Sequence, residues 1–212
     1  MTNVSEPDFV GRGATNRVYR WRVVDIVVAS VLAVAAGLVF VLWNIASNPL
    51  TAPLGALLPG LQALAGGGWL FAGVLVAMVI RKPGAAIYGE LVAATVSALV
   101  GNQWGVLTLV SGLVQGLGAE LVFAIFLYRV WNLPVAVLAG AVAGVAMAAN
   151  DLVLWYPGAA AAFAVTYTVA GIVSGAVIAG ALSWYAVRGL AKTGALSRFA
   201  SGRTGSRSDL TR

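Results

Sequence analysis

The stretch that decides the fold is Val23–Trp43, VVDIVVASVLAVAAGLVFVLW, in which apolar residues occupy nearly every position. A helix that crosses the hydrocarbon core of a bilayer needs about 20 mostly apolar residues, and this run has that length. Five further apolar runs follow it, at about residues 66–80, 85–100, 105–128, 134–154 and 159–187. The sequence therefore predicts an all-α, polytopic membrane protein with six transmembrane helices, the first at about residues 23–43.

The composition agrees with this fold class. Of the 212 residues, 60% are apolar and 9% are charged, whereas roughly a quarter of the residues of a soluble domain are charged. The chain has no His and no Cys, which excludes zinc fingers, disulfides and a Ser-His-Asp triad. No P-loop and no metal-ligand cluster occurs in the sequence, so we expect no cofactor, no bound metal and no enzyme.

The placement of the 13 Lys and Arg residues predicts the orientation. Arg81 and Lys82 follow the second apolar run, Arg129 follows the fourth, and the others flank the first run or follow the last. With six spans, all of them fall on the side that holds both termini, and the positive-inside rule makes that side cytoplasmic. A seventh span would break this pattern. We expect a multi-pass protein of the bacterial inner (cytoplasmic) membrane.

Two tails flank the predicted membrane domain of residues 19–190. Residues 1–18 and 191–212 are predicted to be cytoplasmic, and the second tail is rich in Arg. Their basic side chains are expected to contact anionic lipid head groups. Nucleic acid is not an expected partner, because aromatic residues do not alternate with the basic ones. The first apolar run is long and lacks a cleavage site after it, so it is not a signal peptide.

The segment 44–65 is predicted to lie outside, between the first two spans. Its three prolines prevent one continuous spanning helix; they are Pro49, Pro53 and Pro59. A short helix is expected near residues 54–64, before the glycine triplet 66–68. The segment is either a connecting interfacial loop or a lid over an outward-facing cavity.

Three acidic residues lie inside the apolar runs and cannot easily extend to the membrane surface: Glu90, Glu120 and Asp151. A charged group in a span costs about 2.5–3.5 kcal/mol on insertion scales, so such residues are candidates for a functional site. At a rise of 1.5 Å per residue, Glu90 and Glu120 lie at similar depth, about 10 and 13 Å from the cytoplasmic surface. They are interpreted as a proton relay, a cation site or the partner of a cationic ligand. The alternative is that they stay protonated and hydrogen-bond a neighbouring helix.

Amide and aromatic residues gather at the outer ends of the predicted spans. They include Trp43, Asn44, Asn102, Trp104 and Asn150. Such aromatic residues form either an interfacial belt or the walls of a pocket, in which the rings stack on a flat ligand and the amides bind its edge. The repeated pairing of Asn with Trp favours the pocket.

Ala29, Ala33 and Gly37 repeat every four residues on one face of the first span. Small residues at this spacing allow helices to approach closely in a membrane. This face therefore contacts either another helix of the same chain or an external partner subunit.

Four segments in order resemble the YkoE family. They are Arg81-Lys82-Pro83-Gly84-Ala85, Gly89-Glu90, Gly101-Asn102-Gln103-Trp104-Gly105 and Gln115-Gly116-Leu117-Gly118-Ala119-Glu120. Proteins of that family are substrate-binding membrane subunits (S-components) of energy-coupling factor (ECF) transporters, assigned to thiamine or its hydroxymethylpyrimidine precursor. The resemblance runs from about residue 19 to residue 188.

The resemblance implies a six-helix subunit that captures the vitamin from outside and works with a transmembrane coupling subunit and a pair of cytoplasmic ATPases. Ala29, Ala33 and Gly37 resemble the Ala-x-x-x-Ala motif that contacts the coupling subunit, with Gly at the third position. In this picture the segment 44–65 closes over the ligand.

Residue type and estimated depth select the residues of the ligand pocket. Glu120 and Gln115 are expected to hold the pyrimidine edge, and Trp104 to stack on the ring. The full predicted substrate-binding set is Trp43, Asn44, Glu90, Asn102, Trp104, Gln115, Glu120 and Asn150.

An alternative function is a stand-alone proton- or cation-coupled carrier of small molecules that uses Glu90 and Glu120 as its relay. Uptake that depends on the proton gradient without ATPase partners would favour it. An intramembrane enzyme with these carboxylates as acid and base is less supported, because no nucleophile with a nearby base occurs.

Overall fold

The computed structural model describes residues 19–197 and 199–202, and this part of the chain is all-helical, without strands. In chain order, the elements are α2 (Val23–Ala46), α3 (Asn48–Leu57), the 3-10 helix η1 (Leu61–Trp69), α4 (Phe71–Ile80), α5 (Ala85–Val100), α6 (Leu107–Ile125), α7 (Leu133–Leu154), α8 (Ala161–Ser174), the π-helix η2 (Gly175–Leu182) and α9 (Ser183–Lys192). The predicted all-α class is confirmed.

Five helical units are long and apolar enough to cross a membrane, and α5 is a shorter apolar helix of 16 residues. The five units are α2, η1 continued by α4, α6, α7, and α8 continued through η2 into α9. Most ends lie within five residues of the predicted runs. The largest difference at a helix start is in the second run, which begins at Leu61 rather than at residue 66.

The glycine triplet 66–68 continues this helix rather than interrupting it. A Cβ at Gly68 would lie 2.2 Å from Nε1 of Trp43, and a Cβ at Gly67 would lie 2.6 Å from the carbonyl oxygen of Ser174. The Ser174 hydroxyl also accepts a hydrogen bond from the backbone N–H of Gly67 (2.8 Å). Glycine is therefore needed here for close approach between η1 and its neighbours, and not for a flexible break.

The segment 44–65 holds the end of α2, then α3 and the first turns of η1. The short helix expected near residues 54–64 is instead α3, at Asn48–Leu57. Pro49 lies in its first turn, where a helix needs no backbone N–H, and so favours an earlier start. The chain then turns at Gly60, whose φ of +105° is accessible mainly to glycine, and this turn separates α3 from η1.

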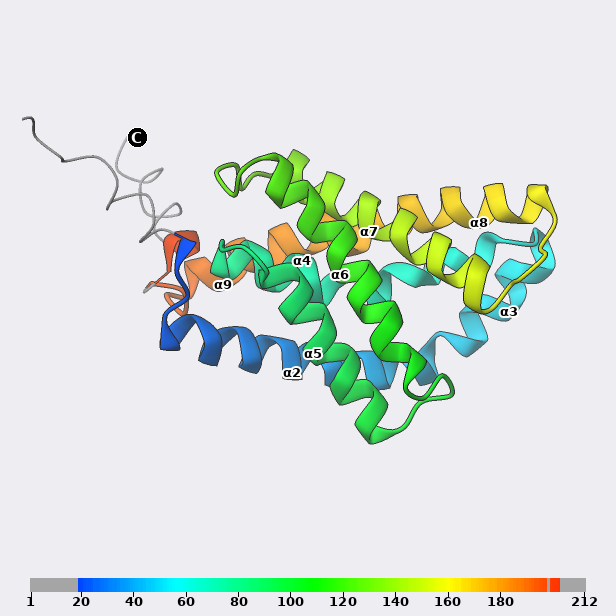
Figure 1. Ribbon diagram of the computed structural model, residues 1–212, viewed down its shortest axis with the longest axis horizontal. Helices are drawn as coiled ribbons and strands as arrows, with labels where there is room; N and C mark the ends of the chain where they lie inside the picture. Colours follow the sequence, from blue (N-terminus) through cyan, green and yellow to red (C-terminus); the bar gives the residue numbers. More distant parts are fainter. Residues whose placement is uncertain (1–18, 198, 203–212) are drawn as a thin grey trace, which may run out of the picture.

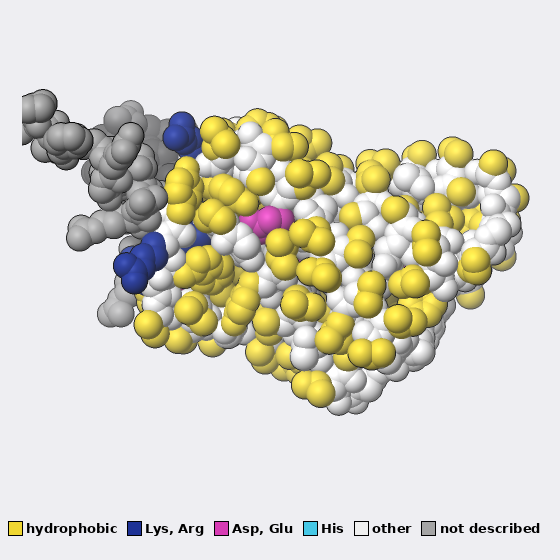
Figure 2. Space-filling view, viewed as in Figure 1, with side chains coloured by type: hydrophobic (Ala, Val, Ile, Leu, Met, Phe, Trp, Pro, Cys, Tyr) yellow, Lys and Arg dark blue, Asp and Glu magenta, His cyan; other side chains and the backbone are white. Residues whose placement is uncertain are grey.

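Helix α4 lies at the centre of the molecule, and eight of its ten residues are buried. Helix α2 packs on α4 and α5, α5 packs on α6, and α6 packs on α7. On the other side, α7 packs on α8 and η2 (Figure 1). The outward faces carry large apolar side chains, such as Val31 and Leu42 of α2, and Figure 2 shows such side chains across the visible face. An apolar surface of this extent is typical of a protein that contacts lipid.

Glycines bring α7 and the helix formed by α8 and η2 into backbone contact. A Cβ at Gly140 would lie 2.1 Å from the carbonyl oxygen of Gly175, and a Cβ at Gly144 would lie 2.2 Å from that of Gly171. Small residues allow this spacing between membrane helices.

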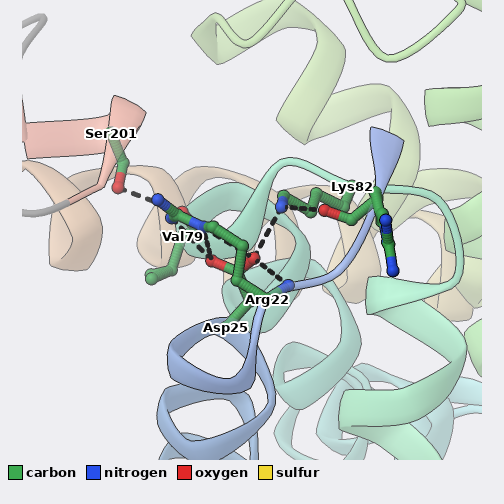
Figure 3. Close-up of polar contacts among 6 residues, drawn as sticks. Arg22, Asp25, Val79, Lys82 and Ser201 are labelled. Carbon is green, nitrogen blue, oxygen red and sulfur yellow. Dashed lines mark hydrogen bonds and ion pairs between the residues drawn. The ribbon is translucent and has the colours of Figure 1, made fainter. Parts of the chain in front are cut away.

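A buried ionic cluster joins the start of α2 to the turn between α4 and α5 (Figure 3). Asp25 is fully buried, and its carboxylate contacts Nη2 of Arg22 at 2.8 Å and Nζ of Lys82 at 2.5 Å. Close by, the Ser201 hydroxyl donates to the carbonyl oxygen of Val79 at 3.1 Å. The ion pairs fix the beginning of α2 to the turn after α4, and the Ser201 hydrogen bond joins the end of α4 to the last described residues.

The predicted tails fall largely outside the described residues, which exclude residues 1–18 and 203–212. Within the second predicted tail, Leu196 and Phe199 are buried and belong to the hydrophobic core cluster. The described start of that segment therefore packs against the bundle. The two ends of the described chain lie at the same end of the molecule in Figure 1.

Candidate functional site

A cavity of about 660 Å³ lies among α2, α3, η1 and α5 to α8. Figure 1 shows that α3 lies at the end of the molecule opposite the two ends of the described chain. The volume of the cavity is in the range of about 300–1,000 Å³ that is typical of small-molecule sites. Among the described residues, no Lys or Arg lines it. The aromatic lining residues are Phe40, Trp69, Trp104, Trp155, Tyr156 and Tyr167, and the lining residues with carboxyl groups are Glu90 and Asp151.

Glu90 lies on α5 and is 1% exposed. Its Oε2 accepts a hydrogen bond from the backbone N–H of Gly73 on α4 at 2.6 Å. Its Oε1 is buried and has no hydrogen-bond partner in the described structure. An unpaired buried oxygen costs about 1–3 kcal/mol, so this atom is a candidate for contact with a ligand.

Glycines on α6 make room beside Glu90. A Cβ at Gly112 would lie 3.3 Å from the backbone oxygen of Glu90, and a Cβ at Gly116 would lie 3.1 Å from its Cβ. Gln115 of the same helix is buried and lines the cavity. Helix α6 therefore adds an amide to the cavity wall that also holds the carboxyl group of α5.

Asp151, near the end of α7, is the second carboxyl group in the cavity wall. Its Oδ2 accepts a hydrogen bond from the hydroxyl of Tyr167 on α8 at 2.8 Å, and its Oδ1 accepts one from the amide of Asn150 at 3.1 Å. Asn150 also donates to the hydroxyl of Ser111 on α6 at 2.9 Å. The carboxyl group is thus held by α7 and α8, and Asn150 connects it to α6.

A polar network joins α2 to η1 and α5 at the cavity wall. Nε1 of Trp69 donates to Oδ1 of Asn44 at 2.7 Å, and Nδ2 of Asn44 donates to the hydroxyl of Ser97 at 3.1 Å. The ring centroids of Trp69 and Trp104 are 5.6 Å apart in an edge-to-face arrangement. These contacts fix two indole rings in the wall, where an aromatic ligand can pack against them.

Four of the eight predicted pocket residues line this cavity: Asn44, Glu90, Trp104 and Gln115. Helices α2, α5 and α6 and the loop before α6 bring them together. The other four, Trp43, Asn102, Glu120 and Asn150, are not among its lining residues.

Glu120 is placed at the start of α5, where it accepts hydrogen bonds from backbone N–H groups. Its Oε1 contacts the N–H of Gly84 at 2.6 Å, and its Oε2 contacts that of Ala86 at 2.8 Å. Tyr128, which follows the end of α6, donates its hydroxyl to Oε1 at 2.8 Å. Burial and the Glu120 carboxylate raise the pKa of the Tyr128 hydroxyl, so it remains a donor at neutral pH. The carboxylate therefore satisfies the free N–H groups at the start of a helix.

Three predicted residues outside the lining, Trp43, Asn102 and Asn150, hydrogen-bond to residues in the cavity wall or next to it. Nε1 of Trp43 donates to the carbonyl oxygen of Ala65 in η1 at 3.0 Å. Oδ1 of Asn102 accepts from the backbone N–H of Trp104 at 2.9 Å and so orders the loop that carries this ring. Asn150 orients Asp151.

The small residues of α2 face the inside of the chain. Ala29 and Ala33 are fully buried, and a Cβ at Gly37 would lie 2.6 Å from Cβ of Val96 and 2.8 Å from the backbone oxygen of Ala93 on α5. Of the two alternatives for this face, packing against a helix of the same chain is present in the structure. Contact with a coupling subunit at these residues stays a prediction.

Sequence reasoning did not place Trp69, Asp151 and Tyr167 in the pocket. Asp151 carried a usable signal, since it is an acidic residue within an apolar run. Trp69 stands directly after the glycine triplet, whose helical packing could not be inferred from composition. Tyr167 lacks a signal of its own, because its role depends on the contact between α7 and α8.

Comparison with known proteins relates this chain to transport proteins in three ways. The family described as the permease component of the ABC-type cobalt transport system matches residues 24–146. The chain is 37% identical over 184 residues to a Bacillus subtilis (strain 168) protein named as an HMP/thiamine permease protein, YkoE, covering 86% of this chain and 91% of that protein. The crystal structure of an S-component of an ECF transporter superposes with a TM-score of 0.82 at 34% identity, covering 90% of this chain and 95% of that one.

Proposed function

The chain belongs to the family of S-components that includes YkoE, and from this premise we propose that it is the substrate-binding subunit of an ATP-driven transporter that takes up thiamine or its hydroxymethylpyrimidine precursor. Family membership makes it a multi-pass transport protein of the cytoplasmic membrane, and not an enzyme. Beyond family membership, we propose the identity of the ligand, the coupling to ATP hydrolysis and the residues that bind the ligand.

The proposed topology has six spans with both termini in the cytoplasm. Five long helical units and the shorter α5 supply the six segments. The two ends of the described chain and the turn between α4 and α5, with Arg81 and Lys82, lie at one end of the molecule (Figure 1). In the view of Figure 2, the basic side chains also gather at this end, as the positive-inside rule expects of the cytoplasmic side. The cavity then lies toward the outer face.

The observation that carries the ligand proposal is the buried, unpartnered Oε1 of Glu90 in the wall of an aromatic cavity. The aminopyrimidine ring common to both ligands presents an exocyclic amine and ring nitrogens at one edge. We assign Glu90 and Gln115 to this edge and the rings of Trp69 and Trp104 to its faces. Asn44 positions Trp69 through the hydrogen bond described above.

Helix α3 is proposed to act as the lid of the cavity. Its lining residues include Asn48, Thr51 and Gly55, and none of the residues of α3 is buried. A helix held by few buried contacts can move at a low free-energy cost. Opening at α3 would admit the ligand from outside.

The expected partners are a transmembrane coupling subunit and a pair of cytoplasmic ATPases. This expectation rests on the likeness to an ECF S-component, and on a chain that has no P-loop of its own. The stand-alone carrier based on a pair of Glu90 and Glu120 is less favoured, because Glu120 caps α5 and does not line the cavity.

Calorimetric titration of the purified chain and its Glu90→Gln variant tests the ligand proposal. Glu90→Gln removes the carboxylate acceptor, so the affinity for both thiamine and hydroxymethylpyrimidine should fall at least about tenfold. Thr95→Val on the same helix is the matched control, because the Thr95 hydroxyl donates to the carbonyl oxygen of Leu91 in its own helix and Thr95 is not among the described residues that line the cavity. Equal affinity for both ligands in wild-type and Glu90→Gln protein contradicts the assignment of Glu90.

A further inference from the structure

The two carboxyl groups of the cavity have different surroundings. Glu90 packs beside Gly112 and Gly116 of α6, with one oxygen bound to a backbone N–H and the other unpartnered. Asp151 lies near the end of α7, one helical turn before Trp155. Both of its carboxylate oxygens accept hydrogen bonds from side chains. The cavity therefore presents two acidic positions with different chemistry.

We infer that Asp151 is the residue that makes the cavity selective for a positively charged ligand, with its carboxylate as the counter-charge. The inference rests on the proposed function and deepens it: Glu90 recognises the ring edge common to both candidate ligands, and Asp151 recognises a cation that only one of them carries. That cation is the thiazolium ring of thiamine.

The partners of Asp151 provide the first argument. Tyr167 and Asn150 are neutral donors, and among the described residues no Lys or Arg lines the cavity. A partly buried carboxylate without a cationic partner is costly to the folded protein. An Asn at position 151 would accept the Tyr167 hydrogen bond without that cost, so packing alone does not require an acid here.

The orientation of Asp151 provides the second argument. Asn150 is anchored to Ser111 of α6, and it in turn donates to Asp151. Tyr167 donates from α8. The carboxylate is therefore fixed before any ligand arrives, and preorganised charges bind a complementary ion with a lower entropic cost than mobile ones.

The aromatic rings near Asp151 provide the third argument. Trp155, Tyr156 and Tyr167 all line the cavity, and the centroids of the two tyrosine rings are 5.3 Å apart. Aromatic faces attract cations, and most strongly where water is excluded. A carboxylate among aromatic rings thus suits a large delocalised cation better than a small hydrated one.

The test measures the affinities of full-length protein in detergent for thiamine and for hydroxymethylpyrimidine, which lacks the cation. Asp151→Asn should weaken thiamine binding at least about tenfold, as expected when a charged partner is lost. It should change hydroxymethylpyrimidine binding by less than about twofold, which also shows that the variant is folded. Asp151→Glu, which keeps the charge, should retain part of the preference for thiamine.

Tyr167→Phe supplies a second variant, with Tyr88→Phe as its matched control. Tyr88→Phe removes a hydroxyl that contacts Ser30, and Tyr88 is not among the lining residues of the cavity. Tyr167→Phe releases one oxygen of Asp151 and should weaken thiamine binding more than hydroxymethylpyrimidine binding, whereas Tyr88→Phe should weaken neither. If Asp151→Asn lowers both affinities by the same factor, or leaves thiamine binding unchanged, the inference is wrong.

Failure of the proposed function gives a different result. In that case wild-type protein binds neither thiamine nor hydroxymethylpyrimidine. The methylated thiazolium cation without a pyrimidine ring, compared with neutral thiazole, then probes Asp151 directly. Binding of the cation alone, lost in Asp151→Asn, supports the inference, and equal behaviour of the two compounds overturns it.

Discussion

At the residue scale, four acidic side chains in the described helices show how partners determine roles. Asp25 is paired with Arg22 and Lys82, and Glu120 is held by backbone N–H groups. Asp151 has neutral side-chain donors, and Glu90 keeps one buried oxygen free. Of these four, only Glu90 and Asp151 line the cavity, so we assign the ligand chemistry to these two.

Glu120→Gln tests the structural role of Glu120. The variant loses charge-assisted hydrogen bonds to the N–H groups of Gly84 and Ala86, so the free energy of unfolding should fall by about 1–3 kcal/mol. Thermal unfolding in detergent measures this loss, and titration of the same preparation with thiamine measures affinity. A large loss of affinity with unchanged stability would instead support the predicted contact of Glu120 with the ligand.

The sequence predicted only part of the site, because it does not show in which direction an individual side chain points. Helical rise gave the depth of Glu90 and Glu120 but not the direction of either side chain. Glu120 turns toward the start of α5, since Gly84 and Ala86 present free N–H groups there. Residues at the outer ends were chosen by type, so the predicted set includes Trp104, which lines the cavity, but not the lining residues Trp69 and Tyr167.

At the element scale, the fold depends on close contacts between helix backbones. The start of α5 at Ala85 was predicted to the residue, because Pro83 and Gly84 mark the turn before it. The start of η1 at Leu61 was not, because the predicted run began at residue 66, after a separate short helix. The packing against Trp43 and Ser174 shows why the glycines at 66–68 fit in this helix. The π-helix η2 has no signal in the apolar pattern, and it lies where glycines of α7 contact it.

Gly140→Ala tests the contact between α7 and η2. The new Cβ would lie 2.1 Å from the carbonyl oxygen of Gly175, so the helices must separate and the free energy of unfolding should fall by about 1–3 kcal/mol or more. Gly189→Ala in α9 is the matched control, because nothing lies within 4 Å of its Cβ position. Thermal unfolding of the two variants should differ clearly, and equal stability would contradict the close packing.

A double-mutant cycle at Asp25 and Lys82 tests the link between α2 and the turn after α4. Asp25→Asn leaves the buried Lys82 ammonium without its carboxylate partner, so it should cost about 3–5 kcal/mol of stability, whereas Lys82→Met should cost less because Arg22 still pairs with Asp25. The double variant should cost less than the sum, because the two groups interact directly. Additive losses in thermal unfolding would show that the pair does not couple these elements.

At the scale of the whole molecule, the charge, the cavity and the ends of the described chain agree with the proposed orientation in the membrane. The basic side chains visible in Figure 2 and the two ends of the described chain lie at one end of the molecule, and α3, which contributes to the cavity wall, lies at the other. This polarity suits a subunit that receives its ligand outside and meets its ATPase partners inside. Composition and apolar runs sufficed for the fold class, because the bilayer imposes length and polarity on each span.

Cysteine labelling tests this direction, and the chain has no native Cys to interfere. Val106→Cys lies in the exposed turn before α6, and Thr193→Cys lies in the exposed turn after α9. A membrane-impermeant maleimide should label position 106 in intact cells and position 193 only after permeabilisation. Labelling of both positions from outside would contradict the six-span topology.

The central claim is that this chain alone binds the ligand, in the aromatic cavity. The most direct measurement is the intrinsic tryptophan fluorescence of the detergent-purified chain during titration with thiamine and, separately, with hydroxymethylpyrimidine. Trp69, Trp104 and Trp155 line the cavity, so bound ligand should quench them. We expect saturable quenching with a sub-micromolar Kd, about −8 kcal/mol or better. Folded protein that responds to neither compound would contradict it.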